Sequence, residues 1–102
     1  IKIMKANIQA VNFNVDRKLV DFINIRLEKL QQYYDKIVGI DVSLHTENSS
    51  DKENKSVDIL VKIPGDDLIV KKTAKSFEEA TDMAADALER LLVKRKEKVK
   101  AH

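Results

Sequence analysis

Two stretches in the middle of the chain alternate between apolar and mostly polar side chains, with Leu60 as the exception, and this pattern constrains the fold more than any other feature. The apolar positions of the first stretch are Val38, Ile40, Val42 and Leu44. Those of the second stretch are Val57, Ile59, Val61 and Ile63. Successive strand residues point to opposite faces, so a period of two predicts strands with one buried face. The chain therefore has to build a sheet that is covered on one side.

Two further strands are predicted around this pair. Residues 5–11 alternate, with Ala6, Ile8 and Ala10 on one face. Residues 64–67, with the sequence PGDD, are predicted to form a tight turn, after which residues 68–73 return as a fourth strand. Residues 46–56 are polar and lack periodicity, which predicts a mobile loop.

Two segments carry a helical pattern. The first follows Asp16, a predicted N-cap, and its apolar residues recur at spacings of three and four. These residues are Val20, Ile23, Leu27, Leu30 and Tyr34. The second opens with a predicted capping box of Ser76 and Glu79. Its expected buried stripe is Phe77, Ala80, Ala84, Ala87, Leu88 and Leu91. The order β-α-β-β-β-α predicts an α+β sandwich, a four-stranded sheet with two helices on one face.

The length and composition exclude several classes of protein. A chain of 102 residues has room for a single domain over residues 1–102. Met4 is the expected natural start, which makes residues 1–3 a remnant, and residues 97–102 are expected to form a frayed basic tail. The absence of cysteine excludes a disulfide scaffold and a thiolate metal site, and two glycines argue against a phosphate-binding loop. No apolar run approaches the roughly 20 residues of a membrane span, so no membrane partner is expected.

Few side chains are suited to catalysis or metal binding. His45 falls on the outward phase of its strand and His102 ends the chain, and neither has a ligand partner nearby in sequence. Asp82 and Asp86 share one face of the last helix, where we expect them to be solvated or to pair with Arg90 rather than to form an acid–base dyad. We therefore expect no enzyme activity, no cofactor, no metal and no small-molecule substrate.

The net charge of +2 hides a strong asymmetry in the last helical segment. From Ser76 to Glu89 there are five acidic residues and no basic ones, and from Arg90 to His102 there are six basic residues and one acidic. Matching the helix dipole accounts for only about two or three of these bases. The surplus favours an anionic partner, and a solvated lysine-rich surface is the alternative.

Helical geometry places the bases of this segment. At about 100° per residue, Arg90, Lys94 and Lys98 form a ladder at i, i+4 and i+8 on one flank, long enough to touch two or three phosphates. Arg95 continues the line of the buried stripe and is expected to project past the edge of the sheet.

The first helix carries cations as well. Lys18 and Lys29 share an outward bearing, Arg26 lies near them, and the apolar Phe22 and Ile25 lie beside them. If the helices lie side by side, the two basic flanks form one groove. Three lysines before the second helix are expected to extend it: Lys71, Lys72 and Lys75. Contacts of this kind bind phosphates without reading base sequence.

Three separated blocks, in the right order around the predicted elements, resemble one known family. The blocks are residues 8–16, Leu27-Glu28-Lys29-Leu30 with Tyr34, and the last-helix positions Asp82, Asp86, Leu88-Glu89-Arg90, Leu92, Lys94, Lys96 and Lys98. The family is that of the ribosome hibernation promoting factors, also called sigma-54 modulation proteins or ribosome-associated inhibitor A. The chain departs from it at Ala10, where glycine is common, and at Ile25, where a charged residue is usual.

The resemblance implies a fold similar to double-stranded RNA-binding domains, with an additional strand. It implies a cytoplasmic protein that binds the small ribosomal subunit between head and body, against ribosomal RNA, and inhibits translation under stress or in stationary phase by occupying the place of messenger and transfer RNA. Matching positions assign the RNA contacts to Lys29, Arg90, Lys94 and Lys98, followed by Lys18, Arg26 and Arg95. The chain resembles the short form, which acts with a separate ribosome-dimerising partner.

Two other functions stay open at this point. One is a protein-interaction modulator of transcription, which would use Phe22, Ile25 and the acidic start of the last helix. The other is a free-standing binder of double-stranded RNA.

Overall fold

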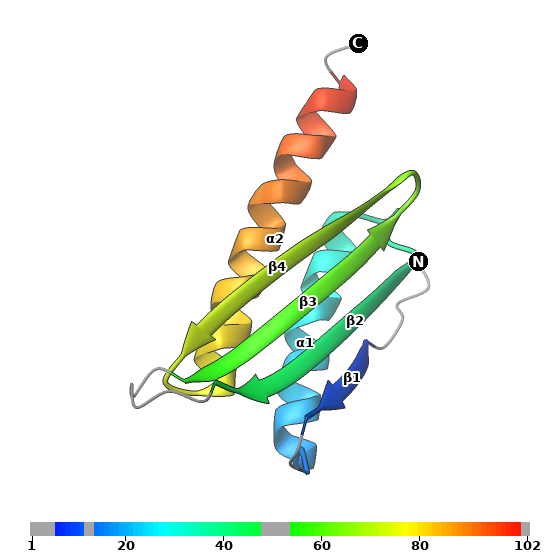
Figure 1. Ribbon diagram of the computed structural model, residues 1–102. Helices are drawn as coiled ribbons and strands as arrows, with labels where there is room; N and C mark the ends of the chain where they lie inside the picture. Colours follow the sequence, from blue (N-terminus) through cyan, green and yellow to red (C-terminus); the bar gives the residue numbers. More distant parts are fainter. Residues whose placement is uncertain (1–5, 12–13, 48–53, 101–102) are drawn as a thin grey trace.

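Four strands form one sheet in the order β1-β2-β3-β4, and both helices lie on one face of it (Figure 1). The computed structural model describes residues 6–11, 14–47 and 54–100, with the backbone alone for residues 97–100. The elements are β1 (Asn7–Ala10), α1 (Arg17–Tyr33), β2 (Gly39–Thr46), β3 (Lys55–Ile63), β4 (Asp66–Ala74) and α2 (Phe77–Lys100). The predicted β-α-β-β-β-α sandwich is confirmed.

The sheet is mixed. β2, β3 and β4 form an antiparallel meander, whereas β1 pairs in parallel with β2 across the α1 connection. The register places Ile8 beside Val42, Val42 opposite Ile59, and Ile59 opposite Val70. An apolar row therefore crosses all four strands on the side that the helices cover. We call the other side of the sheet the open face.

The turn between β3 and β4 is shorter than expected. Only Pro64 and Gly65 form it, and Asp66 and Asp67 already belong to β4. Gly65 has φ = 80°, a conformation that glycine adopts without steric cost. Proline followed by glycine at positive φ is a combination typical of a type II turn.

Side-chain caps start both helices where the sequence predicts them. Asp16 Oδ1 accepts a 2.8 Å hydrogen bond from the backbone N–H of Leu19. Ser76 Oγ accepts one of 3.1 Å from the N–H of Glu79. Each cap satisfies a backbone donor that the first turn of a helix leaves free.

The buried stripe of α2 differs from the prediction at its C-terminal end. Leu92 is fully buried, whereas Leu91 is 38% exposed, so the expected burial of Leu91 is wrong. The cause is that α2 is buried on two sides, by the sheet and by α1, which rotates the buried arc toward α1 and includes Thr81 and Ala85. In α1 the same effect makes Leu19 rather than Val20 the buried residue of the first turn.

Several expectations fall at or beyond the limits of the described residues. Residues 1–3 and 48–53 lie outside them, and residues 48–53 make up most of the loop that is expected over residues 46–56. The ends of this expected loop are wrong, because Thr46 belongs to β2, and Lys55 and Ser56 belong to β3. The tail that is expected to fray over residues 97–102 has a helical backbone as far as Lys100, so this expectation is wrong for residues 97–100. In the described part of the chain, no helix is both long and apolar enough to cross a membrane.

Candidate nucleic-acid interface

The two helices lie side by side and run in the same direction. Arg26 of α1 contacts Asp82 and Asp86 of α2, and Tyr33, seven residues later in α1, contacts Lys96. Residues further along α1 thus meet residues further along α2, as Figure 1 also shows. The helices are adjacent, as the predicted groove requires, but that their basic flanks form one groove stays a prediction.

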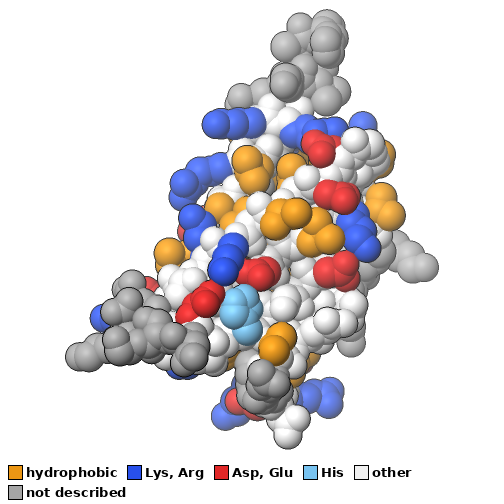
Figure 2. Space-filling view, in the orientation of Figure 1, with side chains coloured by type: hydrophobic (Ala, Val, Ile, Leu, Met, Phe, Trp, Pro, Cys, Tyr) orange, Lys and Arg blue, Asp and Glu red, His pale blue; other side chains and the backbone are white. Residues whose placement is uncertain are grey.

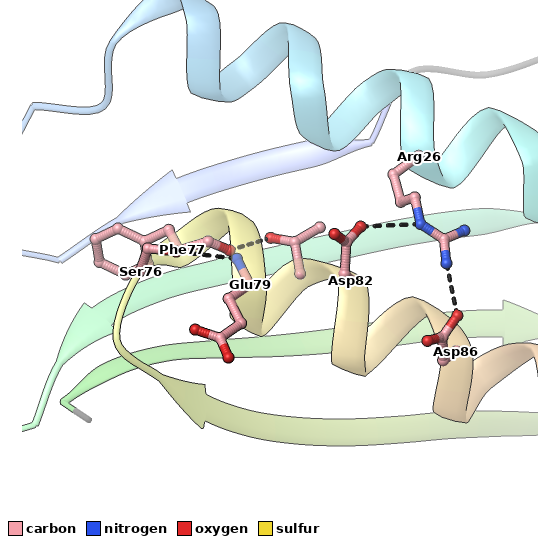
Figure 3. Close-up of polar contacts among 7 residues, drawn as sticks. Arg26, Ser76, Phe77, Glu79, Asp82 and Asp86 are labelled. Carbon is pink, nitrogen blue, oxygen red and sulfur yellow. Dashed lines mark hydrogen bonds and ion pairs between the residues drawn. The ribbon is translucent and has the colours of Figure 1, made fainter.

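Arg26 joins the helices through two carboxylates (Figure 3). Its Nε donates to Asp82 Oδ1 at 3.0 Å, and its Nη2 donates to Asp86 Oδ1 at 2.6 Å. We call these three residues the helix clamp. The sequence predicted Arg26 as an RNA contact and Asp82 and Asp86 as solvated or paired with Arg90, but the structure pairs both acids with Arg26.

A second contact joins the helices nearer their C-terminal ends. The Nζ atom of Lys96 lies 4.8 Å from the centroid of the Tyr33 ring. The same atom is 3.5 Å from the backbone carbonyl oxygen of Tyr33. A cation at this distance from an aromatic face is attracted by the ring. Lys96 therefore contributes to holding α1 against α2.

Four predicted contact residues have exposed side chains on the helices. We call them the helix cations: Lys18 and Lys29 on α1, and Arg90 and Lys94 on α2. Among the described residues, none of the four forms an ion pair. Lys98 lies within α2, but the structure describes only its backbone. The helix cations are thus available to an anionic partner.

Arg95 is engaged within the chain. Its Nη1 donates a 2.8 Å hydrogen bond to Oδ2 of Asp66, the first residue of β4. The sequence predicts that Arg95 continues the line of the buried stripe and projects past the edge of the sheet, whereas in the structure its guanidinium contacts the start of the edge strand β4. Its charge is partly neutralised by Asp66 rather than left free.

The three lysines before α2 do not form one group. Lys71 lies on the open face, where its Nζ is 3.1 Å from Glu47 Oε1, so the expectation that it extends the helix groove is wrong. Lys72 alternates to the helix side of β4, opposite the buried Val57, and is partly buried. Lys75 is exposed between β4 and α2. The cause is the alternation of the strand itself, which sends Lys71 and Lys72 to opposite faces.

A small charged cluster occupies the open face around Glu47. Glu47 Oε1 also lies 3.2 Å from His45 Nε2, and Figure 2 shows a histidine among acidic and basic side chains on this face. The hydrogen bonds from Lys71 and His45 hold the pKa of Glu47 below its ordinary value, and Glu47 raises the pKa of Lys71. No group of three metal-ligating side chains occurs in the part of the chain that the structure describes.

The sequence did not predict the two partners of Arg26 on α2. Asp82 and Asp86 are four residues apart and flank the buried positions Thr81 and Ala85. Acids beside a buried stripe face whatever packs next to that helix, and this was the available signal.

The fold and its surface define a class of small α+β protein with two parallel helices on one side of a sheet, which carry exposed cations that form no ion pair within the described residues. Residues 6–100 match the family described as sigma 54 modulation protein / S30EA ribosomal protein. The chain belongs to this family.

Its relatives include ribosome hibernation promoting factors. The factor of Pseudomonas putida is 30% identical over 95 residues, which cover 93% of this chain and 89% of the relative. That of Escherichia coli K12 is 29% identical, with 97% and 100% covered. The ribosome hibernation promotion factor of Bacillus subtilis is 34% identical, and the match covers 94% of this chain and 50% of the relative.

Solved structures share the fold. A ribosomal subunit interface protein from Coxiella burnetii superposes with a TM-score of 0.79 at 24% identity, over 91% of this chain and 98% of that one. The N-terminal domain of Protein Y from Thermus thermophilus gives 0.68 at 20% identity, over 86% and 94%. The family is ribosome-associated and is not a known enzyme family, and the names of its members support a role in ribosome hibernation.

Proposed function

We propose that this protein is a hibernation factor that binds the small ribosomal subunit near the decoding channel and blocks messenger and transfer RNA. Its helix cations bind phosphates of ribosomal RNA there, and translation is inhibited under stress or in stationary phase. The proposal makes no use of a catalytic step, because its action is occupancy of the RNA path.

One observation carries this proposal beyond the family name. Arg90 and Lys94 are exposed one turn apart on α2, and neither has an ion-pair partner among the described residues. Lys62 and Lys71, on the open face, are by contrast paired with Asp41 and Glu47. Unpaired cations gain most from phosphate contact because they lose no existing partner.

Co-sedimentation with isolated small subunits at several salt concentrations tests the assignment. We compare R90Q/K94Q with the matched variant K62Q/K71Q, which removes two lysines from the other face. R90Q/K94Q is expected to weaken binding and to reduce the salt slope by roughly 0.7 to 0.9 per lost phosphate contact. K62Q/K71Q is expected to bind like the wild type.

Equal losses in both variants would assign the binding to general charge rather than to the helices. Stronger loss in K62Q/K71Q would move the interface to the open face. A second measurement tests the blocking step: labelled messenger RNA is expected to bind less to small subunits that are saturated with the protein. Undiminished messenger binding would contradict occupancy of the decoding channel.

A second candidate, a protein-interaction modulator, has one observation in its favour. Ile25 is 60% exposed on α1 beside the partly buried Phe22. An exposed apolar residue within a charged surface is a feature of protein contacts as well. An I25D variant that loses a protein partner and keeps small-subunit binding would support this candidate.

A further inference from the structure

We propose that Arg26 is a positioning residue rather than a phosphate ligand. Through Asp82 and Asp86 it holds α1 against α2 and so sets the spacing between Lys29 and Arg90. This inference rests on the proposed function, since the spacing matters only if both helices bind one RNA surface.

The charge and exposure of the helix clamp argue against direct phosphate binding by Arg26. One guanidinium faces two carboxylates, so the clamp as a whole carries a formal charge of −1. The side chain of Arg26 is 21% exposed, whereas those of Asp82 and Asp86 are 53% and 54% exposed. A phosphate approaching this point meets the two acids before it meets the cation.

The geometry of the contacts argues for positioning. Nε and Nη2 of one planar group bind acids that are four residues apart, which restrains both the separation and the sliding of the helices. The contact between Tyr33 and Lys96 restrains them a second time. Two separate restraints between parallel helices fix their relative placement better than apolar packing alone.

Two of the helix cations lie between these restraints. Lys29 follows Arg26 by three residues and Arg90 follows Asp86 by four, about 4.5 Å and 6 Å along the respective helices. Both precede the level of Tyr33 and Lys96. The clamp therefore determines how far apart Lys29 and Arg90 are presented. Phosphates of a folded RNA have fixed positions, so both cations bind at once only at the right separation.

The main test uses a variant for which charge and positioning predict opposite outcomes. D82N/D86N removes two negative charges from the helix surface, which on electrostatic grounds tightens RNA binding. If the clamp positions the cations, the same variant weakens binding to small subunits by about three- to tenfold. The matched control is E78Q/E89Q, which removes two exposed acids of α2 that have no ion pair among the described residues. It is expected to bind as the wild type does or more tightly. Equal tightening in both variants overturns the inference.

A double-mutant cycle separates positioning from direct contact. If Arg26 acts through the acids, R26Q weakens binding about as much as D82N/D86N does, and it causes no further loss in the D82N/D86N background. A direct phosphate contact would make R26Q as costly, or more so, in that background, and this result overturns the inference. Circular dichroism of each variant checks that the fold is retained.

A distance measurement on the isolated protein tests whether the helix clamp sets the spacing between α1 and α2. The chain has no cysteine, so spin labels at Q32C and E89C report one distance between exposed positions on the two helices. Introducing D82N/D86N is expected to shift or broaden the distance distribution, and an unchanged distribution contradicts the clamp. If the wild-type protein fails to bind small subunits, the proposed function fails, while this measurement still decides whether the clamp sets the helix spacing.

Discussion

Arg95 and Asp66 connect the C-terminal half of α2 to the start of β4 through a 2.8 Å hydrogen bond between Nη1 and Oδ2. Twenty-nine residues separate the two in sequence. The pair ties the helix to the turn end of the β3–β4 hairpin.

D66N is expected to lower the free energy of unfolding by about 0.2–1 kcal/mol, because both partners are partly exposed and water screens the pair. Urea denaturation at low and high salt measures this, and the difference from the wild type should shrink at high salt. The control is D67N, next in the strand and without an ion pair in the described structure. A loss of several kcal/mol, or one insensitive to salt, would contradict this account.

Replacing each of two adjacent leucines tests the buried face of α2. L92A is expected to cost about 2–5 kcal/mol, since Leu92 is fully buried and its removal leaves a cavity. L91A removes a partly exposed side chain and should cost less than about 1 kcal/mol. Urea denaturation of both variants gives the two free energies of unfolding. A larger loss for L91A than for L92A would support the buried stripe with Leu91 that the sequence predicts.

Alanine is expected to lower the stability of the protein more at Gly65 than at Gly39. G65A is expected to destabilise the protein by about 1–2 kcal/mol, because its φ of 80° is strained for any residue with a Cβ, although nothing obstructs the atom. G39A adds a Cβ at 3.7 Å from Lys62 Cδ, an ordinary contact, and is expected to be near neutral. Thermal melting of both variants measures the difference. Similar melting temperatures would mean that the turn tolerates a side chain.

The cluster around Glu47 predicts that the stability of the protein depends on pH, with stability lost both in acid and in alkali. Glu47 has its pKa lowered from 4.5, so its contribution is present at higher pH and is lost as pH falls through the lowered value. Lys71 has its pKa raised from 10.5, so its contribution is present below that value and is lost as pH rises through the raised one.

E47Q is therefore expected to be less stable than the wild type in the neutral range and to approach it in acid and in strong alkali. Thermal melting across pH measures the gap between the two proteins. E78Q, which removes an acid outside the cluster, is the control. A gap that is constant from acid to alkali would show that the ion pair between Glu47 and Lys71 does not contribute.

Local patterns were sufficient to predict the elements of this fold. Alternation with a period of two identified β2 and β3, and the caps at Asp16 and Ser76 identified where the helices start. Each of these signals depends on neighbours within a few residues. The same alternation also implied that Lys71 and Lys72 point to opposite faces, although their sequence proximity suggested one basic group.

Contacts between elements account for what the sequence did not predict. Leu92 rather than Leu91 is buried because α1 covers one flank of α2, and a pattern within a single helix does not contain that neighbour. In the sequence Arg26 is not distinguishable from the other cations of the helices, because its two partners lie 56 and 60 residues away. The cations could be located on their helices from the sequence, but which of them are neutralised could not.

Arg90 and Lys94, which form no ion pair in the described part of the chain, have a consequence for α2 itself. Like charges one turn apart repel and weaken a helix by about 0.2–0.5 kcal/mol. In the unbound protein the repulsion between these two side chains thus opposes the helical conformation of the backbone at this turn. A polyanion that spans both side chains removes the repulsion, so complex formation and ordering of this turn are thermodynamically coupled. Backbone amides between Arg90 and Lys94 should then exchange hydrogen more slowly in the complex than in the free protein.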